Sequence, residues 1–576
     1  MVTSTVSTEN KAGAESPNYT EYAGDYGSII QSRLLELEKN RFAERFFDYD
    51  HLLWADNPSE ITNRLGWVHL PKQMLAAINE IDDFSESIRK KGFTEVVVLG
   101  MGGSSLSSEV FRNIFTLRDG FLRLTLLDTT DPDFILKTRE SIDLLRTLFV
   151  VSSKSGSTVE TVSLMKYFYG ELERKTEAPG EHFICITDPG SGLIKTADKH
   201  GFSRVFINDP NVGGRFSALS YFGLVPASLA GVDIRKILQS AFSVLLELEN
   251  SVGGKYHESP SFRLGTFLGV MAEQGRDKLG FVFSEKLFPF GCWVEQLIAE
   301  STGKNGVGIL PLLDEEVSDC PRPGDDRAYI LLSLREDRTV DMVASRIRNS
   351  RIPFVKIVVD SPDQIAAELF RFEFAVALAG SIMGINPFDQ PDVESAKAFA
   401  KSFLRLYRET GKLESKEPDF SKNGLVFSSN RKIESPEQLR DIISSKKRGY
   451  ISIQAYVDPA EENSKELLSL RAQIESISSV PVTLGFGPRF LHSTGQLHKG
   501  DSGEGFFIQI VSENENDLCI PDDVGSAESV FSFQVLKMAQ ATGDFKSLDE
   551  MGRGIVRIGI TSDVSESIQR IARFFV

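Results

Sequence analysis

The stretch Glu95-Val-Val-Val-Leu-Gly-Met-Gly-Gly-Ser-Ser105 decides the fold class of this chain. It is a short apolar run that ends in a cluster of glycines and is followed by a helical pattern. Four similar runs come after it, at 122–127, 148–151, 183–187 and 205–207. Buried strands that alternate with helices predict a doubly wound parallel sheet flanked by helices, a three-layer α/β fold.

A second series of strand-like runs begins after about residue 255. Its members are 279–283, 328–332, 354–359, 450–457, 480–486, 506–510 and 555–560, with an amphipathic stretch at 364–385. We expect a first α/β domain over 26–250, with a helical segment at its start, and a second over 251–576. The second would include a polar excursion at 406–446 and a C-terminal α/β part. Residues 1–25 are rich in Thr, Ser, Gly and Glu, so we expect a flexible tail there.

The composition indicates a folded protein with a sizeable core. Of 576 residues, 41% are hydrophobic and 25% charged, which argues against wholesale disorder. With 64 basic and 81 acidic residues, the net charge is −17, and no dense Lys/Arg run offsets it. We therefore do not expect the protein to be a general binder of nucleic acid or of anionic membranes. We find no apolar run of about 18 residues and no signal-peptide pattern in 1–16, so we expect a cytoplasmic protein.

The cysteines and histidines give no metal signature. The four cysteines are scattered, at Cys185, Cys292, Cys320 and Cys519. They are too few for a dense disulfide framework, and their spacing is not that of a zinc site. Nothing in the sequence calls for a metal or another cofactor.

A hydroxyl-rich loop follows the strand run 148–151. It reads Ser152-Ser153-Lys154-Ser155-Gly156-Ser157-Thr158. Hydroxyls, backbone N–H groups and a helix N-terminus together form a phosphate cradle that needs no metal. Because ligands of open α/β sheets bind at the carboxyl edge of the strands, we predict a phosphate site rather than a merely capped turn.

The glycine loop at 100–103 is a weaker signal. A dinucleotide site is the alternative there, since Asp128 stands at the end of the next strand run. However, Ser105 occupies the position of the third glycine in the dinucleotide fingerprint. A nucleotide-dependent oxidoreductase is therefore the weakest of the enzyme hypotheses.

Two further segments carry charged groups suited to proton chemistry. Arg215 follows two glycines, stays charged at any ordinary pH and could stabilise a developing oxyanion. Gln296 and Glu300 are four residues apart on one helical face, and Gly303 indicates that the helix ends there. A carboxylate at the negative end of a helix dipole is disfavoured in its ionised form, and a raised pKa suits a general base. Taken singly, each is more often a surface residue.

The last two segments supply a lysine and histidines. Gln390 and Lys397 are seven residues apart and share a helical face, although a lone lysine is usually a surface residue. His492 and His498 are two of only seven histidines. They lie in a loop-to-helix passage after the strand run 480–486, a position suited to acid–base work.

Together these segments resemble the glucose-6-phosphate isomerase (phosphoglucose isomerase) family. Its signatures GxGGS, SK[ST]xxT, GGR[FY]S, QxxxESxGK and [NS]xFDQxxVExxK stand in the family's order between residues 99 and 397. The resemblance implies two sugar-isomerase domains, each a parallel sheet flanked by helices. It also implies reversible isomerisation of glucose 6-phosphate and fructose 6-phosphate through an enediolate, a step of glycolysis and gluconeogenesis, without metal or cofactor. A homodimer is implied as well.

The resemblance also assigns roles to single residues. Glu300 would move a proton between C2 and C1 of the sugar, Arg215 would stabilise the enediolate, and Lys397 would assist at the ring oxygen. The residues that would hold or face the sugar phosphate are Ser104, Ser153, Lys154, Ser155, Thr158, Gln296 and Gln390.

The histidine departs from the family's order. In the family, the ring-opening histidine closely follows the glutamate motif, but the run 305–311 offers none. His492-x-x-x-Gln496 echoes the family's spacing after the lysine motif, and His498 is the alternative. We infer that a strand–His–helix–strand unit has moved in chain order while keeping its spatial place. This order is similar to that of the isomerase half of bifunctional transaldolase–phosphoglucose isomerases, although no transaldolase half is present.

Two other functions stay open at this point. A non-catalytic sugar-phosphate sensor would need the phosphate loop but not Glu300, Arg215 and Lys397 together. An isomerase of broader specificity would accept mannose 6-phosphate as well, because the configuration at C2 is read by ångström-scale placement that a sequence does not reveal.

Overall fold

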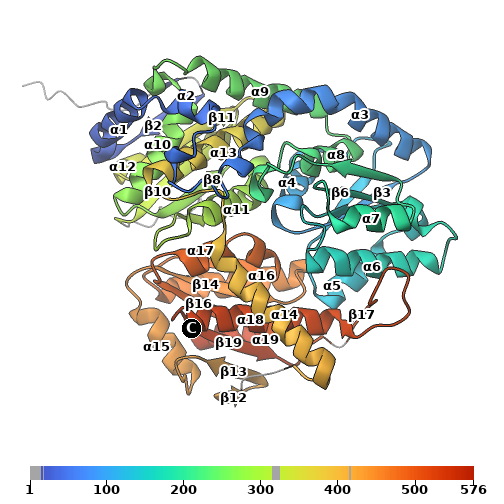
Figure 1. Ribbon diagram of the computed structural model, residues 1–576. Helices are drawn as coiled ribbons and strands as arrows, with labels where there is room; N and C mark the ends of the chain where they lie inside the picture. Colours follow the sequence, from blue (N-terminus) through green and yellow to red (C-terminus); the bar gives the residue numbers. More distant parts are fainter. Residues whose placement is uncertain (1–14, 17, 314–324, 414–416, 515) are drawn as a thin grey trace, which may run out of the picture.

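Each apolar run that we selected from the sequence forms a strand. The computed structural model describes residues 15–16, 18–313, 325–413, 417–514 and 516–576. Its strands build three large sheets, each with helices packed on it, and the three lie around a common centre (Figure 1). The predicted α/β fold class, with parallel sheets flanked by helices, is confirmed.

The first sheet is entirely parallel, in the order β4-β3-β5-β6-β7. Its strands are β3 (Glu95–Gly100), β4 (Arg123–Leu127), β5 (Thr147–Ser152), β6 (Phe183–Thr187) and β7 (Arg204–Ile207). The helices before, between and after them are α3 (Leu70–Lys90), α4 (Leu106–Ile114), α5 (Pro132–Ser141), α6 (Val159–Glu173), α7 (Gly192–Lys199), α8 (Tyr221–Leu229) and α9 (Ile234–Asn250). All six residues of β5 are buried, as expected for a central strand covered on both faces.

The second sheet has the order β1-β2-β11-β10-β8-β9. Its parallel strands are β8 (Lys278–Phe283), β9 (Leu310–Leu312), β10 (Arg327–Leu334) and β11 (Phe354–Val359). Strand β2 (Tyr19–Tyr22) joins it antiparallel to β11, with β1 (Glu15–Ser16) outside it. Residues 19–22, which we expected in a flexible tail, are therefore ordered by strand pairing, and residues 1–14 and 17 lie outside the described part.

The helices of the second unit include one that is buried nearly all round. They are α1 (Gly27–Lys39), α2 (Phe42–Phe47), α10 (Pro260–Glu273), α11 (Phe290–Thr302), α12 (Arg338–Asn349) and α13 (Ile365–Ile382). The stretch 364–385 was expected to be amphipathic, but α13 is buried nearly all round. It lies between α9, α10 and α11. No face of the helix is therefore turned to solvent, where polar residues would be needed.

The third sheet is formed by the runs between 450 and 560, which we had placed in one domain with 279–359. Its order is β12-β13-β19-β16-β14-β15. The strands are β12 (Phe420–Lys422), β13 (Leu425–Ser429), β14 (Tyr450–Tyr456), β15 (Val482–Phe486), β16 (Gly505–Ser512) and β19 (Gly554–Ile560). The helices are α14 (Glu394–Thr410), α15 (Pro436–Ser445), α16 (Glu461–Ile477), α17 (Gly495–Gly500), α18 (Phe533–Glu550) and α19 (Val564–Ala572). A two-stranded ribbon, β17 (Cys519–Ile520) with β18 (Phe531–Ser532), precedes α18.

The polar excursion at 406–446 belongs to this third sheet. It holds the end of α14, strands β12 and β13 and helix α15, apart from residues 414–416, which lie outside the described part. One face of the third sheet is an apolar core of its own, around Ile451, Ile453 and Ile508. The other face carries the buried polar side chains of Gln454 and Gln509. The third sheet is thus a separate packing unit.

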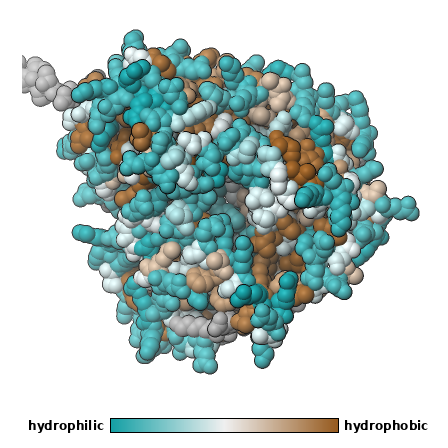
Figure 2. All heavy atoms as spheres, in the orientation of Figure 1, coloured by the Kyte–Doolittle hydropathy of each residue, from teal (hydrophilic) through white to brown (hydrophobic). Residues whose placement is uncertain are grey.

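The surface gives few further clues. Figure 2 shows hydrophilic side chains over most of one face, with hydrophobic ones in separate patches. In the described part of the chain, no helix is long and apolar enough to cross a membrane. Cys185, Cys292 and Cys519 are free thiols, and Cys320 lies outside the described residues.

Candidate active site

The phosphate loop lies between β5 and α6, as predicted. The hydroxyl of Ser153 is 3.0 Å from that of Thr158 and accepts the N–H of Gly156 at 3.1 Å. Gly156 has φ +67°, a value that glycine adopts without strain. The Lys154 ammonium is ion-paired with Asp188 and donates to the Pro210 carbonyl at 2.9 Å. Hydroxyls and backbone N–H groups, rather than a free ammonium, therefore line this loop.

The glycine loop after β3 brings the other loops together. A Cβ atom on Gly102 would lie 2.7 Å from the carbonyl oxygen of His492, and one on Gly103 would lie 2.0 Å from that of Gly214. Only glycines fit these close approaches. Ser104 follows them, and its carbonyl accepts the Ser152 hydroxyl at 2.5 Å. The loop thus packs on the arginine and histidine loops at once.

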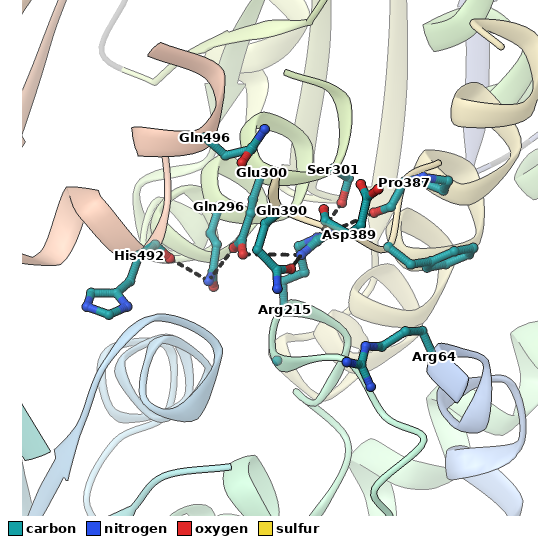
Figure 3. A network of polar contacts seen from close by, with 12 residues as sticks. Arg64, Arg215, Gln296, Glu300, Ser301, Pro387, Asp389, Gln390, His492 and Gln496 are labelled. Carbon is teal, nitrogen blue, oxygen red and sulfur yellow. Dashed lines mark hydrogen bonds and ion pairs between the residues drawn. The ribbon is translucent and has the colours of Figure 1, made fainter. Parts of the chain in front are cut away.

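The glutamate, glutamine and arginine predicted from separate motifs lie in contact (Figure 3). Gln296 and Glu300 face each other on α11, with the Gln296 amide donating to Glu300 Oε2 at 3.0 Å. Arg215 Nη1 is 3.2 Å from Glu300 Oε1. A carboxylate is thereby held beside a fixed positive charge, an arrangement suited to moving a proton and stabilising the oxyanion that results.

Arg215 also holds the loop that carries Gln390. Its side chain is 2% exposed, and Nη2 donates to the carbonyls of Pro387 at 2.6 Å and Asp389 at 3.0 Å. Nη1 donates to Gln390 Oε1 at 2.9 Å, and Nε donates to the Ser301 hydroxyl at 2.7 Å. Burial lowers the pKa of Arg215, while Glu300 and Asp389 oppose this shift.

Lys304 also holds the loop that carries Gln390. Its buried ammonium donates to the carbonyl of Asp389 at 2.6 Å and to the carboxylate Oδ1 at 2.7 Å. Burial, helped by the charge of Arg215, lowers the pKa of Lys304 to about 8. We quoted Lys304 within the glutamate motif but gave it no role, because its partner lies 85 positions along the chain.

The relocated histidine lies next to the glutamate helix. His492 ends a short 3-10 turn (Arg489–His492) after β15, and its carbonyl accepts the Gln296 amide at 2.7 Å. Its ring Nε2 lies 2.9 Å from Glu160 Oε1. Gln496 adds a second link, donating to the Gly303 carbonyl at 2.9 Å. One chain therefore brings His492 and Glu300 to the same site.

Glu160 is a site residue that we missed. It lies in the first turn of α6, directly after the phosphate loop, and is buried. Burial raises the pKa of Glu160, but the charge and hydrogen bond of His492 outweigh this and lower the pKa overall. An acidic residue in a first helical turn is common, so nothing in the sequence distinguishes Glu160 from other such residues.

The two remaining candidates differ in their surroundings. His498 is buried among the rings of Tyr450, Phe490 and Phe507, and burial holds its pKa well below the usual value. Lys397 lies on α14, where its side chain is 43% exposed and 2.9 Å from Glu394. The Lys397 charge also lowers the pKa of Glu160.

Comparisons with known proteins indicate the family that this chain resembles. Residues 71–308 match the family model for phosphoglucose isomerase. The probable glucose-6-phosphate isomerase of Methanococcus maripaludis is 29% identical over 384 residues, covering 60% of this chain and 85% of that protein. The glucose-6-phosphate isomerase of Campylobacter jejuni is 26% identical over 386 residues, covering 59% and 92%.

A solved structure supports the fold. A glucose-6-phosphate isomerase from Chlamydia trachomatis superposes with a TM-score of 0.59 at 19% identity, over 69% of this chain and 90% of that one. These matches confirm the predicted enzyme class, an aldose–ketose isomerase. The resemblance to the phosphoglucose isomerases, stated from the motifs, is likewise confirmed. The family match ends at residue 308, so Gln390, Lys397 and His492 lie beyond it.

Proposed function

We propose that this chain interconverts glucose 6-phosphate and fructose 6-phosphate, as its similarity to glucose-6-phosphate isomerases indicates. The observation that carries the proposal is the contact between Glu300 and Arg215 at 3.2 Å, beside a hydroxyl-rich phosphate loop. Metal-free isomerisation needs a base, a fixed cation and an anchor for the phosphate. These three elements are contributed by different segments of the chain.

The phosphate would bind to the loop before α6. Ser153, Ser155 and Thr158 offer hydroxyls there, and the helix N-terminus adds free N–H groups. Lys154 stands nearby but is already paired with Asp188. Ser104, Gln296 and Gln390 would contact the rest of the sugar. Binding energy from the phosphate would position the distant carbons C1 and C2.

Ring opening would use the histidine side of the site. His492 would exchange a proton with the ring oxygen, and Lys397 would assist. The Glu160 carboxylate, 2.9 Å from His492 Nε2, would stabilise the imidazolium form of the ring. The bond between C1 and the ring oxygen breaks, and the open aldehyde results.

Proton transfer would then use the glutamate side. Glu300 takes the proton from C2, the C1 carbonyl becomes part of an enediolate, and Arg215 stabilises its negative charge. The proton of the C2 hydroxyl passes to the oxygen on C1, and Glu300 returns to C1 the proton that it took from C2, which leaves the ketone at C2. Atoms and electrons balance within the sugar, so no external oxidant, reductant or metal is required.

Two alternatives make different predictions. A sugar-phosphate sensor would bind the sugar phosphate without turnover, although the contact between Glu300 and Arg215 favours an enzyme. A broader enzyme would also convert mannose 6-phosphate. The cytoplasm is the location that we expect. Gln296 donates both to Glu300 and to the His492 carbonyl of the same chain, so we propose that each chain completes its own site, whether or not it forms the homodimer that the resemblance implies.

The test is conversion of fructose 6-phosphate to glucose 6-phosphate without added metal. We expect wild type to turn over and Glu300→Gln to lose activity by a factor on the order of 10²–10⁴, the typical worth of a general base. His492→Ala should slow the reaction of ring-closed substrate, whereas His498→Ala, the matched control, should not. Binding without turnover would support the sensor, and near-normal activity of Glu300→Gln would overturn the assignment of the base.

A further inference from the structure

The histidine loop reaches the site because two sheets meet by their carboxyl edges. The carboxyl end of β4 continues into residues 128–131, and the carboxyl ends of β14, β15 and β16 face them. Figure 1 shows α18 of the third unit running below α5 of the first. The edge at which an open α/β sheet usually binds a ligand is here covered by another part of the same chain.

Ion pairs hold this contact. Lys537 on α18 donates to Asp131 Oδ2 at 2.9 Å, and both side chains are 0% exposed. Arg489, three residues before His492, donates to Asp128 at 2.5 Å and lies 2.6 Å from Glu109. Asp128, the residue that made a dinucleotide site an alternative, is thus engaged in docking the histidine loop.

A chain of side-chain hydrogen bonds runs from this contact to the histidine. Gln540 lies one turn after Lys537 on α18. Its amide nitrogen donates to Glu160 Oε1 at 2.6 Å, and its Oε1 accepts the Thr130 hydroxyl at 2.9 Å. The same Glu160 oxygen is 2.9 Å from His492 Nε2. Gln540 is buried and has both ends of its amide engaged, so its orientation is fixed.

This arrangement determines which nitrogen of the imidazole can react. With Nε2–H donated to Glu160, Nδ1 is the nitrogen left to exchange a proton with the sugar. A carboxylate held by one hydrogen bond can rotate, whereas one held by two cannot do so without losing one. We propose that Gln540 is a positioning residue for ring opening: it fixes the Glu160 carboxylate and, through it, the His492 ring. This rests on the proposed function and deepens it.

The experiment separates ring opening from proton transfer. Ring opening and closure exchange the α and β anomers of glucose 6-phosphate, and magnetisation-transfer NMR measures that exchange. The Glu300→Gln background removes the transfer between C2 and C1, so that anomer exchange is observed alone. In this background we expect Gln540→Met to slow enzyme-catalysed exchange about tenfold or more, since small misplacements of a catalytic group can cost up to 10²-fold.

A matched control lies on the same helix. Gln534 precedes Gln540 on α18, and its Oε1 has no hydrogen-bond partner among the described residues. Gln534→Met makes the same chemical change and should leave anomer exchange unaltered. Sorbitol 6-phosphate, an open-chain probe with no ring to open, should bind all variants with the same Kd. The pH profile of exchange should shift in Gln540→Met only.

The outcomes are distinguishable. If Glu300→Gln shows no anomer exchange and wild type shows no isomerisation, the proposed function itself fails. If both activities are present but Gln540→Met exchanges anomers as fast as Gln534→Met, the positioning role is refuted. If the affinity for sorbitol 6-phosphate falls in step with the exchange rate, Gln540 supports the fold rather than the histidine, and the proposal is again overturned.

Discussion

Replacing Lys537 by methionine tests how the third sheet is held against the first. Methionine keeps most of the side-chain volume but removes the ammonium 2.9 Å from Asp131. The Asp131 carboxylate then stays buried with only neutral partners, such as the Asn514 amide at 3.2 Å. Removing one partner of a buried pair costs about 3–5 kcal/mol. With a urea dependence of about 2 kcal/mol per molar, that loss lowers a midpoint by roughly 2 M.

The assay exploits the position of the tryptophans. All three, Trp54, Trp67 and Trp293, precede the third unit, so their fluorescence reports on the first two units. Isomerase activity in the proposed mechanism requires the docked His492 loop. In Lys537→Met, we expect activity to be lost at a clearly lower urea concentration than the fluorescence change, whereas in wild type the two should lie closer together.

A second variant isolates the electrostatic cause. Asp131→Asn removes the charge that Lys537→Met leaves unpaired and keeps a side chain that can cap α5. In the double variant that combines Lys537→Met and Asp131→Asn, the urea midpoint should therefore return most of the way to the wild-type value. An unchanged midpoint in Lys537→Met, or an equal shift of activity and fluorescence, would refute the reasoning that this pair secures the docking.

Three further outcomes follow from the site. Arg215→Lys keeps a charge but not the planar fork, so kcat should fall about 10²-fold with little change in KM; a change confined to KM would contradict a role in the transition state. Because burial lowers the pKa of Lys304 to about 8, its ammonium is lost as pH rises through that value, and activity should fall with it. Lys304→Arg stays charged, so its alkaline limb should move to higher pH in the rate profile. Mixing the Glu300→Gln and His492→Ala variants should restore no activity, and recovery in the mixture would show that sites are shared between chains.

Most strands could be predicted because they are buried on both faces. Phe183–Thr187 and Phe354–Val359 were predicted to the residue, since each is a short, mainly apolar run between polar turns. Their assignment to sheets could not be predicted in the same way. Parallel strands of different sheets have the same pattern, and β10 and β14 differ in their partners rather than in their composition.

Some residues of the candidate site could be predicted from the sequence and others could not. Glu300 and Arg215 could be selected because glycines and a helix end stand beside them in the sequence. Glu160 and Gln540 could not, since each is a single polar residue on a helix. Their meaning depends on hydrogen bonds to residues 332 and 380 positions away, and only the folded chain shows which residues those are.

Strand β2 can pair with its neighbour only late during synthesis at the ribosome. Tyr22 pairs with Phe354, so roughly 330 residues must be added before β2 can pair, which takes on the order of 15–70 s at typical translation rates. The ion-pair partner of its buried Glu21, Arg263, lies 242 residues further along the chain. An unpaired strand that carries a charge resists edge-to-edge association. Glu21 therefore opposes edge-to-edge association of the nascent chain first, and its ion pair with Arg263 stabilises the finished sheet afterwards.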